Sequence, residues 1–481
     1  MDVVKRIAKN TAALLIANII SAVLGFFYGI YIARYLGAEK YGIIAFSIAF
    51  INLFAIFTDI GLLQLMLRDI ARDKSLTAKY LGNIAVLKAF LVIFAYGIII
   101  VVIHLLGYPE STIQIVYIVG LTMVCGSFIN LFNSVFQANE KMEYVSIESI
   151  LSGSFMLAGG LFAIYMGLPL IGFAAVYSVS SFAVLAYVVL VAIKLRLPLK
   201  IEADLSFIKT AVKRAIPFGV ANLFMVYYVW IARVMLSYLM DYRNVGYYTA
   251  AYNFMGLFTF IPNAFVTSLF PVMSMSFNTS EDSLRRILHN GIRYMYMLAL
   301  PMAVGVTLLG ENIIGLIYGP GFLPAVEPLT ILIWAEFLIF LDVLLGQMLL
   351  SINRERWTMA SAGIGSALNV LLNIILIPRI GMVGAAMATF STELFFFLFS
   401  LYLLYRCGYR IDVRHVVPKP LFATAVMSAF ILKFIYLPLF LLIALSAVLY
   451  FVTLYLVRYF SKEDVMLIRA LIAFKRHRSA A

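Results

Sequence analysis

The sequence predicts an all-α polytopic membrane protein of about fourteen transmembrane helices, with two pseudo-symmetric six-helix bundles followed by two C-terminal helices. Three observations support this fold class. Of the 481 residues, 64% are hydrophobic and 12% are charged, which is more apolar surface than a soluble fold can bury. Apolar runs long enough to cross a bilayer recur along the whole chain. A pattern near the N-terminus also returns in the second half.

The repeat covers residues 10–57 and 214–261. Each copy has an asparagine early, an Ile-Ala-Arg triplet late, and then a glycine-containing turn into a helix that aligns with its counterpart without a gap. The matched residues are Asn18 and Asn222, Arg34 and Arg233, and Gly42 and Gly246. Because repeats six helices apart share an orientation, we expect two bundles around a central cavity, with cationic groups near the seam.

The expected helices are bounded by charged, glycine- or proline-containing segments. They cover 11–33, 42–67, 81–106, 112–136, 146–166, 169–194, 215–240, 247–271, 291–310, 325–350, 357–378, 381–405, 417–436 and 438–458. The first is longer than the apolar region of a signal peptide and no small-residue cleavage site follows it, so we expect it to be retained.

The charge distribution supports this number of helices. Most of the 36 Lys and Arg residues fall in every second connecting segment, on the side of the N-terminus. By the positive-inside rule, both termini are then cytoplasmic and the protein is a multi-pass component of the cell membrane. The net charge of +13 indicates attraction to anionic lipid of the inner leaflet, and not nucleic-acid binding.

The segmentation predicts five parts: an N-terminal six-helix lobe at 1–194, a cytoplasmic linker at 195–214, a C-terminal six-helix lobe at 215–405, helices 13 and 14 at 406–458, and a basic amphipathic cytoplasmic tail at 459–481. Within the linker, Asp204 is a candidate N-cap of a short surface helix. Ser461 and Asp464 resemble a capping box that opens a surface helix in the tail.

Three cationic residues lie in or beside apolar helices: Arg34, Lys88 and Arg233. A charge at the bilayer centre costs roughly 2.5 to 3.5 kcal/mol on insertion scales, so each needs a reason to be there. One reason is binding of an anionic substrate in a cavity. The alternatives are pairing with a carboxylate of another helix and, for residues near an interface, extension of the side chain into the head-group region.

Five carboxylates also fall within or near the expected helices: Asp59, Glu148, Glu336, Asp342 and Glu393. Each either neutralises an arginine or couples transport to a proton or another cation, for which buried carboxylates are the usual groups.

Amide and aromatic side chains complete the candidate site. We assign Asn18, Asn222 and Asn253 to substrate binding and Asn369 and Asn373 to coupling or charge pairing, although amides also join helices to one another. The aromatic residues around Arg233, which are Tyr227, Tyr228 and Trp230, are candidates for a sugar-binding platform. The pair Gly25 and Gly29 predicts close helix packing.

Several classes of protein have no support in the sequence. Cys125 and Cys407 are not spaced as a metal or redox pair, and neither a P-loop nor an HExxH motif occurs. We therefore expect no enzyme activity, catalytic residue, metal site or cofactor. A glycan polymerase would usually need larger outer loops than this chain provides.

The residues resemble the multidrug/oligosaccharidyl-lipid/polysaccharide flippase superfamily, and within it the Wzx-like polysaccharide exporters. The resemblance covers nearly the whole chain. Its motifs are Arg34-Tyr35-Leu36-Gly37 with Tyr41-Gly42, Arg68-Asp69-Ile70-Ala71, Gln137-Ala138-Asn139-Glu140-Lys141-Met142, Val245-Gly246-Tyr247-Tyr248 with Ala250-Ala251-Tyr252, Tyr318-Gly319-Pro320-Gly321-Phe322, and Leu368-Asn369 through Leu376-Ile377-Pro378 into Gly384-Ala385-Ala386-Met387-Ala388-Thr389.

The resemblance implies two six-helix lobes that alternate between inward-open and outward-open states and move a polyprenyl-pyrophosphate-linked glycan to the outer leaflet. It implies that Arg34 and Arg233 bind the pyrophosphate, and that helices 13 and 14 hold the lipid tail. Sodium-coupled relatives have a carboxylate on the seventh helix, whereas this chain has Arg233. The alternatives are a multidrug or cation antiporter of the same fold and a scaffold protein of the polysaccharide-synthesis machinery.

Overall fold

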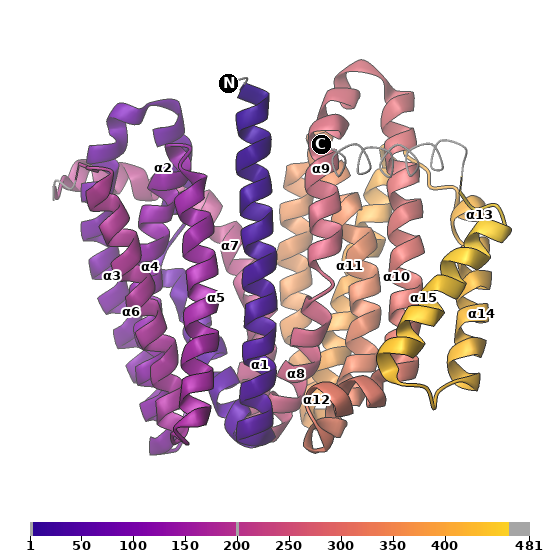
Figure 1. The fold of residues 1–481 in the computed structure, drawn as a ribbon. Helices are drawn as coiled ribbons and strands as arrows, with labels where there is room; N and C mark the ends of the chain where they lie inside the picture. The colour runs from indigo at the N-terminus through magenta and orange to yellow at the C-terminus, as the bar shows by residue number, and fades with distance from the viewer. Residues whose placement is uncertain (1–2, 199–201, 461–481) are drawn as a thin grey trace, which may run out of the picture. The chain divides into compact units, whose positions relative to one another are not determined.

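The computed structural model describes residues 3–198 and 202–460, and within these ranges all regular elements are helices (Figure 1). They are α1 (Val3–Ala55), η1 (Ile56–Thr58), α2 (Leu62–Arg72), η2 (Lys74–Leu76), α3 (Thr77–Leu105), α4 (Glu110–Ala138), α5 (Met142–Tyr165), α6 (Leu170–Lys194), α7 (Leu205–Leu239), α8 (Tyr242–Gly256), α9 (Phe260–Thr279), α10 (Glu281–Ile317), η3 (Pro320–Ala325), α11 (Val326–Ser351), α12 (Glu355–Arg406), α13 (Val413–Val416), α14 (Pro418–Lys433) and α15 (Leu439–Leu456). The predicted all-α class is confirmed.

Eleven helical segments of the described residues are long and apolar enough to cross a membrane. Two of them, Ile16–Thr58 with 43 residues and Glu355–Arg406 with 52, exceed twice the length of about 20 residues that one crossing needs. Each contains a kink. The protein is therefore a multi-span membrane protein, whereas the expected number of about fourteen spans is not confirmed.

The helices form two compact units. Among the described residues, unit 1 comprises 3–198, 202–260, 314–332 and 356–392, and unit 2 comprises 261–313, 333–355 and 393–460. In unit 1, α1 packs against α4, α5, α7 and α8, and α4 packs against α6. Helix α1 bends at Gly37, whose φ of 74° is in the left-handed region that glycine adopts readily. The two helices expected at 11–33 and 42–67 are thus joined into one kinked helix.

The expected helix at 42–67 ends earlier than predicted. Helix α1 stops at Ala55, and the chain continues through η1 and Gly61, with a φ of 87°, into the separate helix α2. Asp59 accepts a hydrogen bond from the backbone N–H of Leu63 at 3.2 Å and so caps this new helix. Hydropathy did not predict the break because the residues on both sides of it are apolar.

Gly42 and Gly246 bring α1 and α8 into backbone contact. A Cβ atom on Gly42 would lie 1.8 Å from the carbonyl oxygen of Tyr242, and one on Gly246 would lie 2.1 Å from that of Ala38. Only glycine fits at either position without separating the helices. Since the two glycines are matched positions of the sequence repeat, the contact between these two helices is reciprocal.

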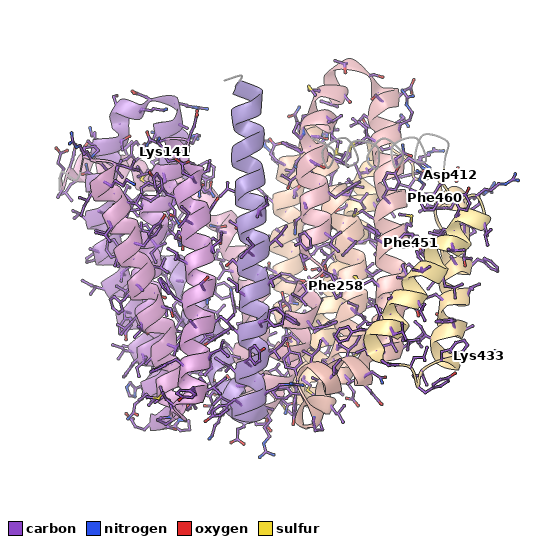
Figure 2. All side chains as sticks on the ribbon, in the orientation of Figure 1. Lys141, Phe258, Asp412, Lys433, Phe451 and Phe460 are labelled. Atoms are coloured by element: carbon purple, nitrogen blue, oxygen red, sulfur yellow. The ribbon has the colours of Figure 1, made fainter. Side chains whose placement is uncertain are left out.

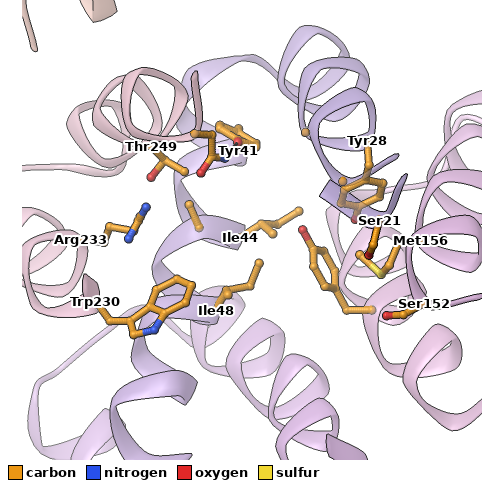
Figure 3. A pocket seen from close by; sticks show the side chains of 16 residues that line it. Ser21, Tyr28, Tyr41, Ile44, Ile48, Ser152, Met156, Trp230, Arg233 and Thr249 are labelled. Carbon is orange, nitrogen blue, oxygen red and sulfur yellow. Dashed lines mark hydrogen bonds between the residues drawn. The ribbon is translucent and has the colours of Figure 1, made fainter. Parts of the chain in front are cut away.

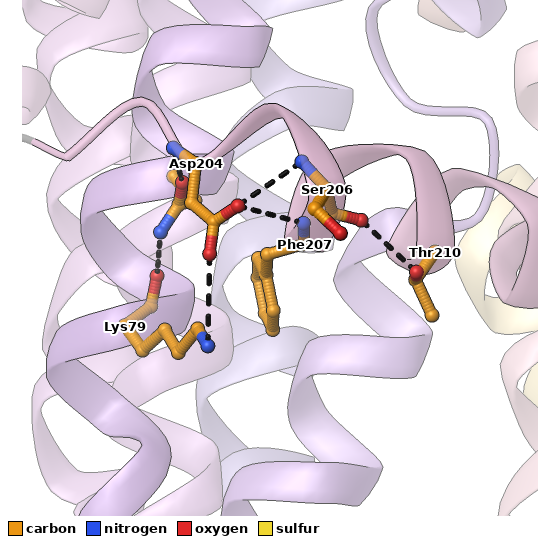
Figure 4. A network of polar contacts seen from close by, with 6 residues as sticks. Lys79, Asp204, Ser206, Phe207 and Thr210 are labelled. Atoms are coloured by element: carbon orange, nitrogen blue, oxygen red, sulfur yellow. Dashed lines mark hydrogen bonds and ion pairs between the residues drawn. The ribbon is translucent and has the colours of Figure 1, made fainter.

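The N-terminal end of α7 is fixed to α3 by polar contacts (Figure 4). Asp204 accepts hydrogen bonds from the backbone N–H groups of Ser206 and Phe207 at 3.0 and 3.1 Å, and its carboxylate lies 3.8 Å from Lys79 Nζ. The predicted N-cap is confirmed. The helix that it caps is not a short surface helix, however, because α7 continues through Pro217 to Leu239.

In unit 2, α14 and α15 form an antiparallel pair, with Lys433 at the turn between them (Figure 2). Their outer faces are apolar, and Phe440 is 78% exposed, as expected for contact with lipid. Helix α12 is kinked at Ile380 and Gly381, near the boundary expected between 378 and 381. Most of the predicted tail helix, at 461–481, lies outside the described residues.

Candidate site at Arg233

A cavity of about 320 Å³ in unit 1 is lined by residues of five helices (Figure 3). Helix α7 contributes Arg233 and Trp230, α8 contributes Thr249 and Asn253, and the remaining lining residues come from α1, α5 and α6. These are Ser21, Gly25, Tyr28, Gly29, Tyr41, Ile44, Ala45, Ile48, Ser152, Gly153, Met156 and Tyr177. The volume is near the lower end of the range of about 300 to 1,000 Å³ that is typical of small-molecule sites.

Arg233 is the cationic group of this cavity and is only 3% exposed. Its guanidinium carbon lies 5.0 Å from the ring centre of Trp230, one helical turn earlier on α7. The ring centres of Tyr252 and Tyr248 on α8 lie 4.4 and 5.9 Å away. Aromatic faces attract a cation, and the attraction increases when water is excluded. The rings therefore hold the guanidinium in place without neutralising its charge.

The hydrogen bonds of Arg233 are incomplete. One terminal nitrogen donates to the carbonyl oxygen of Val229 in its own helix at 2.9 Å, whereas Nε is buried without a partner. In the described part of the chain no carboxylate lies within ion-pairing distance of this guanidinium. A buried charge without a counter-ion is unfavourable by several kcal/mol, so the site is suited to an anion that enters from outside.

Two predicted site residues, Arg233 and Asn253, line this cavity, and Asn253 donates to the hydroxyl oxygen of Tyr41 at 3.1 Å. Trp230 also lines it, but its ring lies against the guanidinium. Sequence reasoning missed Tyr28 and Thr249. The signal for Tyr28 is present in the sequence, because small and polar residues recur on the same face of α1 at intervals of three or four.

The other predicted substrate-binding residues lie elsewhere. Arg34 is exposed on α1 and donates to the carbonyl oxygen of Leu316. Asn18 and Asn222 are also exposed. Lys88 is only 1% exposed and does not line the cavity. The structure therefore does not bring Arg34 and Arg233 together in this cavity.

Lys88 has partners within the protein. Its ammonium donates to the carbonyl oxygen of Thr58 at 3.0 Å and to the hydroxyl of Ser127 at 3.2 Å, and it interacts electrostatically with Asp59. These groups belong to η1, to the segment after it and to α4. Lys88 thus contacts the place where the chain leaves α1 and enters α2.

The five predicted carboxylates do not line the Arg233 cavity. In unit 1, Asp59 caps α2, and Glu148 accepts a hydrogen bond from Asn133 at 3.2 Å. In unit 2, Glu336 and Asp342 belong to α11, while Glu393 belongs to α12. Their assignment to coupling stays a prediction.

The amides of α12 contact one another. Asn373 donates to the backbone and side-chain oxygens of Asn369, both at 2.9 Å, and Asn369 donates to Thr392 Oγ1 at 3.2 Å. Asn369 and Asn373 precede the kink and Thr392 follows it. The cluster therefore joins the two halves of α12, and Thr389 connects this helix to Tyr248 of α8 at 3.2 Å.

Similar proteins are known. The profile of the family described as polysaccharide biosynthesis protein matches residues 7–277, and that of the MatE family matches residues 217–375. A probable low-salt glycan biosynthesis flippase, Agl15 of Haloferax volcanii, is 24% identical over 80% of each chain. The probable flippase AglR of the same organism is 25% identical over 80% of each chain. A putative O-antigen transporter of Shigella flexneri is 25% identical over 61% of this chain and 72% of that protein.

Solved structures share the fold. The lipid II flippase MurJ in an inward closed conformation superposes with a TM-score of 0.76 at 16% identity, over 95% of this chain and 99% of that one. An inward-facing multidrug transporter of the MATE family superposes with a TM-score of 0.67 at 14% identity, over 81% and 95%. Because the family profile matches more than half of the chain, the protein belongs to the polysaccharide biosynthesis protein family.

Proposed function

We propose that the protein translocates a polyprenyl-pyrophosphate-linked oligosaccharide or polysaccharide repeat unit across the cell membrane, and that Arg233 binds the pyrophosphate. The observation that carries this proposal is the buried guanidinium of Arg233, which lines a cavity and has no carboxylate partner among the described residues. The names of the relatives, which are glycan flippases and an O-antigen transporter, support the same substrate class.

The chemistry of the site fits a phosphate better than a neutral sugar alone. A guanidinium presents a planar set of N–H donors that matches phosphate oxygens, and charge-assisted hydrogen bonds are roughly twice as strong as neutral ones. Phosphate binding gives the unpaired Nε of Arg233 an acceptor and neutralises a charge that the protein itself leaves uncompensated. The aromatic rings around the guanidinium exclude water and strengthen this attraction.

Transport in this proposal follows alternating access between the lobes at 1–194 and 215–405, with both termini cytoplasmic. The polar head group enters the cavity from the inner leaflet while the lipid tail remains in the bilayer. The apolar outer faces of α14 and α15 support a role for these two helices in contacting that tail. The membrane potential or a proton supplies the driving force.

The proposal is tested with purified protein in liposomes that contain a fluorescent polyprenyl-pyrophosphate oligosaccharide. Arg233→Gln should reduce translocation by roughly 10- to 150-fold, which corresponds to about 1.5 to 3 kcal/mol for a hydrogen bond to a charged group. Arg233→Lys should retain part of the activity because it keeps the charge. Arg243→Gln, at an exposed ion pair outside the cavity, serves as the control. Unchanged transport by Arg233→Gln would refute the proposal.

A multidrug or cation antiporter is the competing function, since the MatE profile and the MATE structures share the fold. A cationic drug gains nothing from an unpaired cation and is repelled by it. The same liposomes distinguish the two functions. The antiporter would be favoured if a drug stimulated proton or sodium release and the protein did not translocate the glycan lipid.

A further inference from the structure

The wall of the cavity opposite Arg233 has a different chemical character. Figure 3 shows Tyr28 and Ser21 of α1 and Ser152 and Met156 of α5 across the cavity from Arg233 and Trp230. The lining residues contributed by α1, α5 and α6 carry no charge. Hydroxyl groups, aromatic rings and glycines predominate, which is a surface suited to a neutral polyol.

Tyr28 and Thr249 place buried hydroxyl groups in the cavity. Tyr28 and Thr249 are each 5% exposed. The Tyr28 hydroxyl interacts with that of Tyr177, which also lines the cavity, whereas Thr249 Oγ1 makes no hydrogen bond in the described part of the chain. Buried polar groups are nearly always paired, so an unpaired group deserves an explanation. Both groups line the same cavity as the unpaired Nε of Arg233. A single bound molecule with several hydroxyl groups would satisfy them.

Gly25 and Gly29 of α1 leave space in this cavity. The sequence predicted close helix packing for this pair, and the structure contradicts it. A Cβ atom on Gly25 would meet no other atom within 4 Å, and the atom nearest to one on Gly29 would be the Tyr41 hydroxyl at 3.8 Å. By contrast, a Cβ atom on Gly153 of α5 would lie 3.1 Å from Leu24, as expected at a true helix contact. The two α1 glycines therefore keep the cavity open.

We infer that the part of the cavity between Thr249 of α8, beside Arg233, and the opposite wall at Tyr28 and Gly25 of α1 is a sugar subsite. This inference rests on the proposed function, in which Arg233 holds the phosphate in the same cavity. The sugar bonded to that phosphate then occupies the open space next to Gly25, and its hydroxyl groups form hydrogen bonds with the hydroxyl groups of Tyr28 and Thr249. Since the cavity measures about 320 Å³, the more distal sugars lie outside it.

The test compares three substrates in liposomes: polyprenyl pyrophosphate without sugar, with one hexose, and with an oligosaccharide. Gly25→Ala, Gly25→Val and Gly25→Leu fill the subsite in steps. We expect binding of the sugar-free lipid to stay within about twofold of the wild type, while binding and translocation of both glycosylated lipids fall progressively, by roughly tenfold or more at Leu. Tyr28→Phe should weaken the binding of both glycosylated lipids by roughly two- to tenfold.

The controls separate this inference from the proposed function. The same three substitutions at Gly97 of α3, where a Cβ atom also meets nothing within 4 Å, should change neither class of substrate. Retained binding of the sugar-free lipid shows that each Gly25 variant is folded. If the Gly25 variants affect all three lipids equally, or none of them, the sugar subsite is wrong. If Arg233→Gln does not weaken the binding of the sugar-free lipid, the proposed function is wrong instead.

Discussion

Arg233 and Lys88 are both buried cations of unit 1, but their surroundings differ. Lys88 donates two hydrogen bonds to oxygen atoms of the protein and interacts with the nearby Asp59. Arg233 has one hydrogen bond to its own helix, an unpaired Nε and a cavity beside it. Burial alone therefore does not identify a binding residue. The distinguishing property is whether the protein itself supplies the partners of the charge.

The two environments imply opposite contributions to stability. The groups around Lys88 compensate much of the unfavourable free energy of burying its charge, and in return the ammonium pairs the Thr58 carbonyl and the Ser127 hydroxyl. The energy of burying Arg233 is compensated only in part by the aromatic rings. This contrast supports a structural role for Lys88 at the α1–α2 break and the proposed role of Arg233 in binding an anion.

The largest expected effect on stability comes from Lys88→Met. This change keeps most of the apolar volume but leaves two buried oxygen atoms without a donor, so we expect destabilisation of about 2 to 4 kcal/mol. Arg233→Met should change stability by about 1 kcal/mol or less, or increase it, because it removes an uncompensated charge. Thermal unfolding of the purified variants in detergent measures both. An equal loss of stability in the two variants would remove the distinction between the sites.

Much of the fold could be predicted from sequence because apolar length and charge alternation report directly on membrane crossing. The positions of the breaks could not. Hydropathy joins residues 42–67 into one helix, yet Gly61 turns the chain there. A second break follows Gly256, inside the helix expected at 247–271. At the first break, Lys88 of α3 donates to the carbonyl oxygen of Thr58, a contact with another helix that local hydrophobicity does not report.

Sequence alone predicts a site residue only where its side chain is of a type that is rare in transmembrane helices. An arginine in an apolar helix is rare, so Arg233 could be found from sequence alone. Tyr28 gives only the periodic pattern of small and polar residues on its face of α1. Thr249 gives no signal, because neutral hydroxyl residues are common in transmembrane helices and only the fold shows that this one lacks a partner. The same limit applies to Gly25, where the sequence predicted a helix contact and the structure has open space.

The contact between α1 and α8 offers a way to disturb the Arg233 cavity without touching the Lys88 cluster. Gly42→Ala places a methyl group on the carbonyl of Tyr242, so the helices must separate, and we expect a loss of about 1 to 3 kcal/mol. Since Tyr41 and Thr249 on these helices line the cavity, glycan transport should fall as well. Gly97→Ala is the control for thermal unfolding and transport. If Gly42→Ala were as stable as the wild type, the close backbone contact between α1 and α8 would be wrong.

A cluster around Asp69 extends the comparison to cations that have a carboxylate partner. Asp69, on α2 and outside the candidate membrane spans, lies 2.8 Å from Arg214 of α7 and accepts hydrogen bonds from Arg68 at 3.0 Å and from Tyr80 at 2.6 Å. Burial alone would raise the pKa of this carboxyl. The hydrogen bonds and the two positive charges outweigh it, and the pKa of Asp69 is lowered.

The sign of this shift predicts a pH dependence. A carboxyl whose pKa is lower in the folded state stabilises the protein above its unfolded pKa of about 3.9, and loses this contribution as the pH falls through the folded value. Both arginines are about half exposed, so we expect about 1 kcal/mol at neutral pH. Asp69→Asn should remove both the stability and its acid dependence in unfolding experiments between pH 7 and 3. A variant that keeps the wild-type pH profile would show that Asp69 is not responsible.

The smallest effect is expected at the exposed ion pair of Arg243 and Glu39, whose atoms lie 3.1 Å apart while the side chains are 66% and 57% exposed. Water solvates both charges when they separate, so Arg243→Gln should change stability by about 0.5 kcal/mol or less, and 1 M salt should abolish even that. Unfolding at low and high salt measures it. Arg243→Gln could instead prove as destabilising as Lys88→Met. Buried hydrogen-bond partners would then not explain the difference between Lys88 and Arg233, and the argument that Arg233 binds an anion would lose its physical basis.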